Sequence, residues 1–291
     1  MFRRSYWLGV LVFPALLVVA GRVEATKARA VRFADVVLET GVRLRYATRG
    51  DSLGEPIIFL HSYTDSWFSF SEVLPRLSPR YRAFALDQRG HGGSERPDSG
   101  YTMRDFAQDV VAFMDAMKLK EATIVGHSMG SLVAREVAAL VPRRITRLVL
   151  VGAPATGTNA SVSGLAEAIE AMQDSIPGAF VQEFQASTIH KPVSPEFLKT
   201  VVSESQRVPA RVWRAVLEGI VDPRDPWALK GVTFPTLIVW GAEDTYFPKP
   251  EQDLLVRAIP NAKLLVYQGT GHAPHWERPT DFVKDLEVFL K

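Results

Sequence analysis

Two histidines near the end of the chain, His272 and His275, are candidates for acid–base chemistry. They lie in the segment GTGHAPHWERP, directly after an apolar run. A histidine in such a loop can act as a general base, bind a metal ion or make an ordinary polar contact. The chain has no cysteine, and no third ligand accompanies the pair at a suitable spacing, so a metal site is not indicated. A general base would need a nucleophile beside it.

Ser128 is the strongest candidate for that nucleophile. It stands at the centre of GHSMGS, between the apolar run ATIV and the helical pattern LVAREVAAL. A strand that turns at once into a helix forces its central residue into a strained backbone conformation and leaves the side chain protruding. Gly126 and Gly130 allow the close approach of strand and helix that this turn requires. The pattern in this context therefore predicts a nucleophilic serine.

The elements that must position these residues can be read from the hydrophobic pattern. Continuous apolar runs cover residues 56–61, 82–87, 122–127, 147–152, 236–241 and 263–268. Strands that are apolar on both faces are typical of the interior of a parallel sheet. Ahead of them, DVVLETG and the alternating GVRLRYATRG predict a hairpin. Helical patterns separate the runs, so we expect an α/β fold with a mostly parallel central sheet and helices on both faces.

Residues 154–232 interrupt this alternation. Four helical patterns follow one another there without a strand: GLAEAIEAM, GAFVQEFQ, SPEFLKTVVSES and PARVWRAVLEGIV. We expect an all-helical cap at 154–232, inserted between two parts of one core α/β domain at 26–153 and 233–291. Ligands of open α/β sheets bind at the carboxyl ends of the strands, and the cap is expected to cover them.

The first 25 residues have the composition of a targeting segment. The basic start MFRRSYW precedes the apolar stretch LGVLVFPALLVVA, and small residues follow in VEA. The apolar stretch is short for a membrane span, which needs about 20 residues. We expect a cleavable export signal at 1–25 and a periplasmic or secreted protein, with an uncleaved N-terminal membrane anchor as the alternative.

The remainder of the chain is balanced in charge. It has 34 basic and 32 acidic residues in all, and three of the arginines and one glutamate lie within residues 1–25. Without a stripe of lysine and arginine, nucleic acid is not expected as a partner. Nothing in the sequence calls for a metal or organic cofactor, and the sequence does not indicate an oligomeric state.

Five sequence blocks resemble the α/β-hydrolase fold family, and the resemblance covers nearly all of the chain after residue 33. The blocks are LHSYTDSW, DQRGHGGSERP, GHSMGS, WGAEDTYFP and GTGHAPHWERP, which follow the third, fourth, fifth, seventh and eighth expected strands. Five blocks in the family's order are far more specific than any one of them. The resemblance implies a serine hydrolase of the esterase branch with a helical lid.

The resemblance also assigns the catalytic roles. In this family the nucleophile comes first, then the acid, then the histidine. Ser128 matches the nucleophile, Asp244 the acid and His272 the base, which leaves His275 a polar supporting role. Asp244 would hold the imidazole in the tautomer that accepts the serine proton. The adjacent Glu243 is expected to face solvent.

Two backbone N–H groups, those of Met129 and Tyr63, are expected to form the oxyanion hole. Met129 directly follows the nucleophile, and the resemblance supplies Tyr63. The chain departs from the family at position 62, where His61-Ser62 stands in place of His-Gly. Glycine would give this loop backbone freedom. Ser62 is therefore either a neutral replacement or an additional oxyanion donor through its hydroxyl.

Other chemically active side chains have a structural interpretation. Asp87, Arg89 and His91 lie in a glycine-rich block that is expected to shape the loop after the fourth strand. A packing role is expected for His127 and a surface position for His190. Trp67 is expected to line an acyl pocket. Four aromatic residues of the cap either line that pocket or form the cap's own core: Phe180, Phe184, Trp213 and Trp227.

The function we expect is hydrolysis of a small-molecule acyl substrate, a carboxylic ester, lactone or thioester, through an acyl-enzyme on Ser128. Epoxide hydrolases and dehalogenases of this fold carry aspartate where this chain has Ser128. A carbon–carbon bond hydrolase or a perhydrolase on the same triad stays open. So does a ligand-binding protein that keeps the fold without catalysis. The acyl length and the alcohol moiety are not indicated.

Overall fold

The computed structural model describes residues 30–172, 175–221, 229 and 232–291 of the chain. The expected export signal at 1–25 and Trp227 lie outside these residues. Within them, no helix has the length and hydrophobicity that a bilayer-spanning segment requires.

Eight strands form one sheet. Their bounds are β1 Arg32–Val37, β2 Arg43–Arg49, β3 Glu55–Leu60, β4 Tyr81–Leu86, β5 Ala122–His127, β6 Ile145–Val151, β7 Thr236–Gly241 and β8 Ala262–Tyr267. The last six coincide with the apolar runs to within about two residues, and the expected hairpin is formed by β1 and β2. The sequence pattern therefore located every strand of this sheet.

The strand order is β1-β2-β4-β3-β5-β6-β7-β8. β2 pairs antiparallel with β1 and β4, and all the other pairs are parallel. The chain moves from β3 outward to β4 and then returns to place β5 on the other side of β3. Such a reversal opens a crevice at the carboxyl ends of the two central strands, which is where α/β sheets bind ligands.

Successive residues of the central strands enter two separate cores. Ile58 and Leu60 of β3 pack into the core on one face of the sheet, whereas Ile57 and Phe59 pack into the core on the other. All four side chains are buried. The prediction of strands that are apolar on both faces is confirmed, because helices cover both sides of the sheet.

The helices of the described residues are α2 Met103–Ala116, α3 Met129–Leu140, α4 Ala160–Glu170, α5 Gly178–Ser187, α6 Pro195–Gln206, α7 Ala210–Val221, α8 Lys249–Ala258, α9 Pro274–Glu277 and α10 Pro279–Phe289. Short 3-10 turns occur at Trp67–Phe70, Leu74–Arg76 and Pro142–Arg144. Residues of α2 and α3 contribute to one core and residues of α10 to the other.

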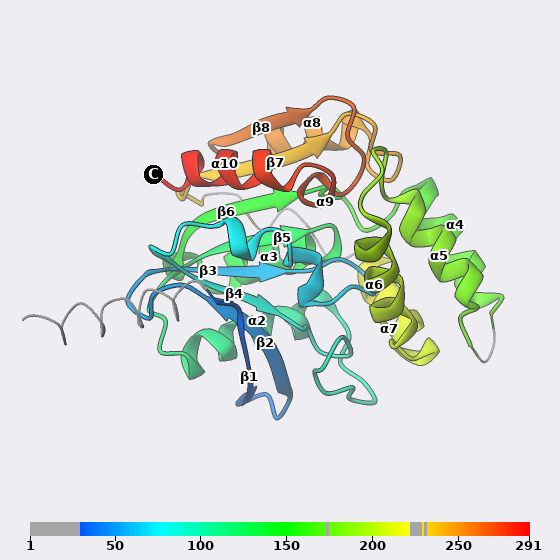
Figure 1. Cartoon of the computed structure of the whole chain (residues 1–291), viewed down its shortest axis with the longest axis horizontal. Coiled ribbons are helices and arrows are strands. Elements are labelled where there is room, and N and C mark those ends of the chain that lie inside the picture. Colours follow the sequence, from blue (N-terminus) through cyan, green and yellow to red (C-terminus); the bar gives the residue numbers. More distant parts are fainter. Residues whose placement is uncertain (1–29, 173–174, 222–228, 230–231) are drawn as a thin grey trace, which may run out of the picture.

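Four of these helices, α4 to α7, lie between β6 and β7 in the chain without a strand among their described residues. Figure 1 shows them gathered at the end of the sheet toward which the arrows of β3 and β6 point. Local capping sets at least one boundary, because the Ser194 side chain accepts a hydrogen bond from Phe197 N at 3.1 Å. We refer to residues 160–221 below as the helical segment.

Candidate active site

Ser128 lies at the junction of β5 and α3 with a strained backbone. Its φ and ψ are 52° and −115°, values that a residue with a Cβ rarely adopts. Two hydrogen bonds hold this turn: Ser128 N donates to Val151 O at 2.9 Å, and the Ser131 hydroxyl donates to Ser128 O at 2.6 Å. The side chain is thereby directed out of the elements that carry it, as expected for a turn between a strand and a helix.

The glycines on either side of Ser128 make this turn sterically feasible. A Cβ on Gly126 would lie 2.1 Å from Gly130 O, and a Cβ on Gly130 would lie 2.2 Å from Leu60 O. Both distances are far below a van der Waals contact, so any larger residue would push α3 away from β5 or β3. Gly126 and Gly130 are thus required by the close packing of three elements.

His272 and Asp244 form a hydrogen-bonded pair beside Ser128. His272 lies in the loop after β8, and its Nδ1 donates to Asp244 Oδ2 at 2.9 Å. Both side chains are buried. Because Nδ1 carries the proton of this bond, Nε2 is left with a free lone pair that can accept one. The His272 backbone is held as well, since its N–H donates to Thr188 O at 2.9 Å.

The carboxylate of Asp244 is fixed by its own loop. Its Oδ1 accepts the N–H groups of Tyr246 and Phe247 at 2.9 and 3.1 Å, which leaves Oδ2 for His272. The neighbouring Glu243 is exposed. The two adjacent acids therefore point to different environments, and Asp244 is the one that contacts the imidazole.

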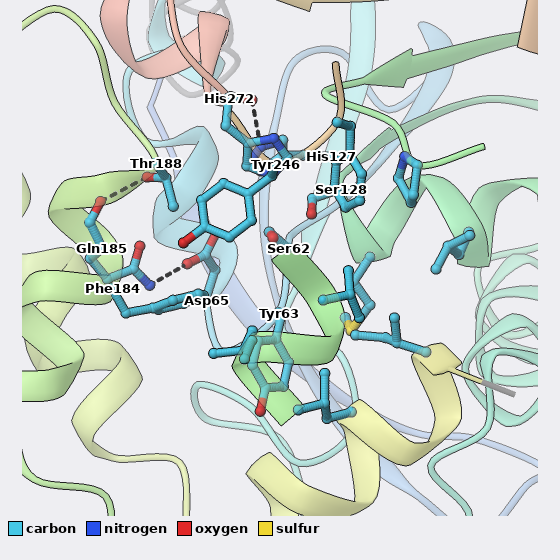
Figure 2. A pocket seen from close by; sticks show the side chains of 18 of the residues that line it. Ser62, Tyr63, Asp65, His127, Ser128, Phe184, Gln185, Thr188, Tyr246 and His272 are labelled. Atoms are coloured by element: carbon cyan, nitrogen blue, oxygen red, sulfur yellow. Dashed lines mark hydrogen bonds between the residues drawn. The ribbon is translucent and has the colours of Figure 1, made fainter. Parts of the chain in front are cut away.

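Ser128 and His272 line one cavity between the sheet and the helical segment (Figure 2). Its polar lining includes Ser62, Asp65, Gln185, Thr188 and Tyr246, and its apolar lining includes Leu132, Pro154, Val162, Leu165, Leu217 and Ile220. Among the described residues, the Ser128 hydroxyl makes no hydrogen bond. Such contacts are commonly long in an unliganded enzyme and shorten when substrate binds.

Two backbone N–H groups beside Ser128 are available to an oxyanion. Met129 is the first residue of α3, so its N–H has no partner inside the helix. Tyr63 follows β3, and both residues line the cavity. Within the described ranges, neither N–H donates to another protein group. Two free donors beside a reactive hydroxyl can stabilise negative charge on a tetrahedral carbon's oxygen.

His61 sets the direction of the Tyr63 N–H. Its Nδ1 donates to Ser62 O at 2.8 Å, and its Nε2 accepts Gln88 N at 3.0 Å. In a planar trans peptide the C=O and the next N–H point in opposite directions. The hydrogen bond holds Ser62 O toward the buried imidazole, so the Tyr63 N–H points away from that imidazole. Burial keeps the pKa of His61 well below its ordinary value, so the ring stays neutral and able to accept.

Ser62 occupies the usual glycine position without backbone strain. It has no positive φ, whereas Thr64 in the same loop has a φ of 65°. The loop thus takes its left-handed turn two residues later, at a position where the side chain is buried. Because residue 62 does not need glycine's conformational freedom, serine fits there.

The block DQRGHGGSERP shapes its loop through buried polar contacts. Asp87 accepts Trp67 N at 2.7 Å and Gly93 N at 2.8 Å. Arg89 donates two hydrogen bonds of 2.6 Å to Asp109. None of these residues lines the cavity in the part of the chain that the structure describes. Their arrangement is that of a structural network, as the glycine-rich pattern predicted.

The other histidines near the site are buried and pack beneath the catalytic residues. His275 in α9 hydrogen-bonds Ser69 Oγ at 3.1 Å, and burial lowers its pKa to about 3. His127 donates from Nε2 to His272 O at 3.2 Å and also contributes to the cavity wall. The pair His272 and His275 is thus divided by environment, because only His272 reaches both a carboxylate and the cavity.

Of the four candidate pocket aromatics that the structure describes, Phe184 is the one found in the lining. Trp213 is fully buried behind it, with ring centroids 5.2 Å from Tyr63 and 5.8 Å from Phe184. Phe180 stacks on Phe184, and Trp67 packs against Phe33. The pocket role expected for Trp67, Phe180 and Trp213 needs correction. Phe180 and Trp213 belong to the core that the sheet shares with the helical segment, and Trp67 packs on the core at the other face of the sheet.

Asp65 and Gln185 both line the cavity, although neither was among the residues predicted from the sequence. Gln185 Nε2 donates to Asp65 Oδ1 at 3.0 Å. Burial raises the pKa of Asp65 to about 7, against an ordinary value of 3.8. A charged residue two positions beyond the expected oxyanion donor was a usable signal for Asp65. Gln185 had none, because its direction depends on how α5 packs on the loop after β3.

Comparison with known proteins matches the chain to a family of hydrolases. The family model described as alpha/beta hydrolase fold matches residues 55–279. A non-heme chloroperoxidase of Streptomyces lividans is 28% identical, with 88% of this chain and 99% of the relative covered. The esterase RhEst1 from Rhodococcus sp. ECU1013 has a TM-score of 0.74 and 25% identity, covering 88% of this chain and 98% of that structure. The esterase EaEST from Exiguobacterium antarcticum shares the fold, with a TM-score of 0.80 at 21% identity over 88% of this chain and 98% of that chain.

Proposed function

The chain belongs to the alpha/beta hydrolase fold family, and on that premise we propose that it is a serine hydrolase that cleaves a carboxylic ester through an acyl-enzyme. The observation that carries the proposal is the 2.9 Å bond from His272 Nδ1 to Asp244 Oδ2 beside the strained Ser128. A buried carboxylate that fixes the imidazole tautomer supports a base that accepts the proton of an adjacent serine.

Acylation begins when the Ser128 hydroxyl attacks the acyl carbon. His272 Nε2 takes the serine proton, and the carbonyl oxygen gains negative charge as the carbon becomes tetrahedral. The N–H groups of Met129 and Tyr63 donate to that oxygen. The intermediate collapses when the bond to the alcohol oxygen breaks, and His272 gives its proton to the departing alkoxide.

Deacylation repeats these steps with water. His272 removes a proton from a water molecule as the water oxygen attacks the acyl carbon of the ester on Ser128. The second tetrahedral intermediate uses the same two N–H donors. Its collapse returns the proton to the Ser128 oxygen and releases the carboxylic acid, so the enzyme ends in its starting state.

The cavity wall supports an apolar acyl or alcohol group as part of the substrate. Side chains of α3, α4 and α7 supply that wall through Leu132, Val162, Leu165, Leu217 and Ile220. Transfer of such a group out of water contributes about 0.8 kcal/mol for each CH₂ buried. Lactones and thioesters satisfy the same requirements as linear esters and are included in the proposal.

Replacement of the nucleophile tests the proposal. Ser128→Ala should lower kcat for p-nitrophenyl butyrate by at least about 10³-fold, because the acyl-enzyme is proposed to form on the Ser128 hydroxyl. It should also abolish labelling by a fluorophosphonate, while the thermal unfolding midpoint stays near that of the wild type. Ser163→Ala, at an exposed position of α4, is the matched control and should behave as the wild type. Full turnover by Ser128→Ala would refute the mechanism.

The same experiments address the alternative functions. A ligand-binding protein without catalysis would not be labelled by the fluorophosphonate. Carbon–carbon bond hydrolysis and perhydrolysis employ the same triad, so they require a product assay. Turnover of an ester is expected to exceed turnover of a vinylogous diketone. Replacing water by hydrogen peroxide as acyl acceptor should give a peracid if perhydrolysis is catalysed.

A further inference from the structure

Asp65 is a buried acid in the cavity that the proposed mechanism does not use. It is 3% exposed and lies in the loop after β3, two residues beyond the oxyanion donor Tyr63. Its own N–H donates to Ser62 O at 3.2 Å, which fixes the loop around it. Figure 2 shows its side chain directed toward Gln185 on the far side of the cavity from His127.

Within the described residues, Oδ1 of the Asp65 carboxyl has a hydrogen-bond partner and Oδ2 has none, while the Ser69 hydroxyl and the Ser62 backbone lie near enough to favour the charged form of the carboxyl. Oδ1 accepts from Gln185 Nε2 at 3.0 Å, and the same nitrogen donates to Ser205 Oγ at 2.8 Å. Oδ2 is buried and has no hydrogen-bond partner within the described residues. A buried carboxyl oxygen without a partner costs about 1–3 kcal/mol, so such an atom is usually satisfied by a bound group.

Asp65 belongs to the lining of the cavity in which the ester would bind. It lines the same cavity as Ser128 and His272, and the His272 side chain is close enough to act electrostatically on its carboxyl group. A substrate whose carbonyl oxygen is held by the Tyr63 N–H therefore lies beside Asp65 as well. The opposite wall, formed by α4 and α7, offers no polar side chain for recognition.

A hydroxyl group is the chemical partner that best suits Asp65 Oδ2. An ammonium group would bring a charge into a cavity whose other walls are largely apolar, at a large desolvation cost. A hydroxyl can donate to the carboxylate and can accept from the protonated acid. Burial raises the pKa of Asp65 to about 7, so both forms exist near neutral pH and a hydroxyl satisfies either.

We propose that Asp65, held by Gln185, is a specificity-determining residue that binds a hydroxyl group on the substrate, so that the enzyme prefers hydroxylated esters. The inference rests on the proposed ester hydrolysis and adds the substrate class. The hydroxyl belongs to the acyl or the alcohol part of the ester, within a few bonds of the scissile carbonyl, because Asp65 and Tyr63 share one loop.

Two pairs of esters test the preference. On the acyl side, p-nitrophenyl 3-hydroxybutyrate is compared with p-nitrophenyl 3-methoxybutyrate. On the alcohol side, 2-hydroxyethyl butyrate is compared with 2-methoxyethyl butyrate. The methoxy group accepts a hydrogen bond and does not donate one. At about pH 8.5 the Asp65 carboxyl is ionised and accepts only, so kcat/KM for the hydroxylated ester should exceed that for its partner by about tenfold or more in at least one pair.

The informative variant is Asp65→Asn. Its amide oxygen keeps the acceptor for Gln185 Nε2 and presents an NH₂ donor in place of Oδ2, which serves hydroxyl and methoxy oxygens alike. The two side chains have the same size, so steric differences between the esters cancel in the ratio. The preference should fall to within about threefold. Asp65→Ala, which lacks both oxygens, is the second variant and should also lose it. Asp98→Asn, at a fully exposed acid, is the control and should keep it.

The outcomes separate this inference from the proposed function. If the wild type hydrolyses butyrate esters and reacts with a fluorophosphonate but shows no hydroxyl preference in either pair, the Asp65 assignment is wrong and ester hydrolysis stands. An equal preference in the wild type and Asp65→Asn overturns the assignment in the same way. If the wild type neither hydrolyses the esters nor is labelled, both proposals fail.

Discussion

At the scale of single residues, the site combines strain with fixed direction. The positive φ of Ser128 costs about 1–3 kcal/mol, and the surrounding packing must supply that free energy. This conformation directs the Ser128 hydroxyl away from β5 and α3. His272 and Asp244 need no strain, because three hydrogen bonds to the Asp244 carboxylate determine where the imidazole lies. The site is therefore preorganised by backbone contacts more than by side-chain adjustment.

Asp65 gives a stability prediction at this scale. The folded protein holds a proton on its carboxyl up to about pH 7, whereas the ordinary pKa is 3.8. Between these values the folded state binds more protons than the unfolded chain, so the contribution of Asp65 to stability falls as the pH rises. Asp65→Asn removes this loss. It should stabilise the protein at pH 8 by up to about 4 kcal/mol relative to wild type, and by much less at pH 4.

Urea unfolding of the wild type and Asp65→Asn at pH 4 and pH 8 measures this difference in the free energy of unfolding. Asp51→Asn, at an exposed acid, should show little change between them. A stability difference between Asp65→Asn and the wild type that does not depend on pH would contradict the assignment of a proton to Asp65 in the folded state.

At the scale of elements, the site depends on how closely α3 approaches β3 and β5. The approach is possible because Gly126 and Gly130 expose backbone where other residues would place a Cβ. The His61 imidazole adds a second connection, between the loop after β3 and the loop after β4, through Gln88 N. Nucleophile and oxyanion donors are thereby positioned by neighbouring strands of one sheet.

The glycine contacts give a prediction at this scale. Gly126→Ala would place a Cβ 2.1 Å from Gly130 O, so β5 and α3 would have to separate. We expect a loss of about 2–4 kcal/mol in the free energy of unfolding, together with loss of esterase activity.

Gly164→Ala in α4 is the matched control. Apart from its chain neighbours and the nearby backbone of α4, no described atom lies within 4 Å of its Cβ position, and alanine favours a helix. This variant should be more stable than the wild type by about 0.5–1 kcal/mol. Chemical unfolding measures both, and equal stabilities for the two variants would show that the steric argument is wrong.

At the scale of the whole molecule, several histidines are buried as neutral groups within or beside the two cores. Burial lowers the pKa of His61, His91, His127 and His275. Each of them takes up a proton more readily in the unfolded chain than in the folded protein. Stability therefore falls when the pH drops below the ordinary histidine pKa of about 6.5.

His275 provides the test at this scale. Its pKa falls to about 3, so its contribution to stability is lost as the pH falls from about 6.5 toward 3. His275→Gln has no such titration and retains a hydrogen-bonding group for Ser69. It should be less stable than the wild type at pH 7, because the ring packs on Phe70, but should lose less stability between pH 7 and pH 4. Thermal unfolding across this range measures the slope. His190→Gln, at an exposed residue, should follow the wild type, and an unchanged slope for His275→Gln would refute the prediction.

Local pattern alone determined the strands, the hairpin, the helical segment and the strained turn at Ser128. Each of these depends on residues that are close in the chain. For such residues, hydrophobic periodicity and the positions of small side chains predict the backbone geometry. The elements and the turn required no knowledge of how distant residues pack. The choice of Asp244 and His272 as partners of Ser128 came from the resemblance of the five sequence blocks to a known family.

The tertiary structure alone decided the contents of the cavity. Gln185 meets Asp65 across 120 positions of sequence, and the Trp213 ring packs against Tyr63, whose hydroxyl donates to Trp213 O across 150. Neither direction follows from helical periodicity, because a helix that packs between a sheet and a cavity buries side chains toward both. The angle at which α5 and α7 lie on the sheet selects the side chains that face the substrate. That angle is set by contacts between residues far apart in the chain.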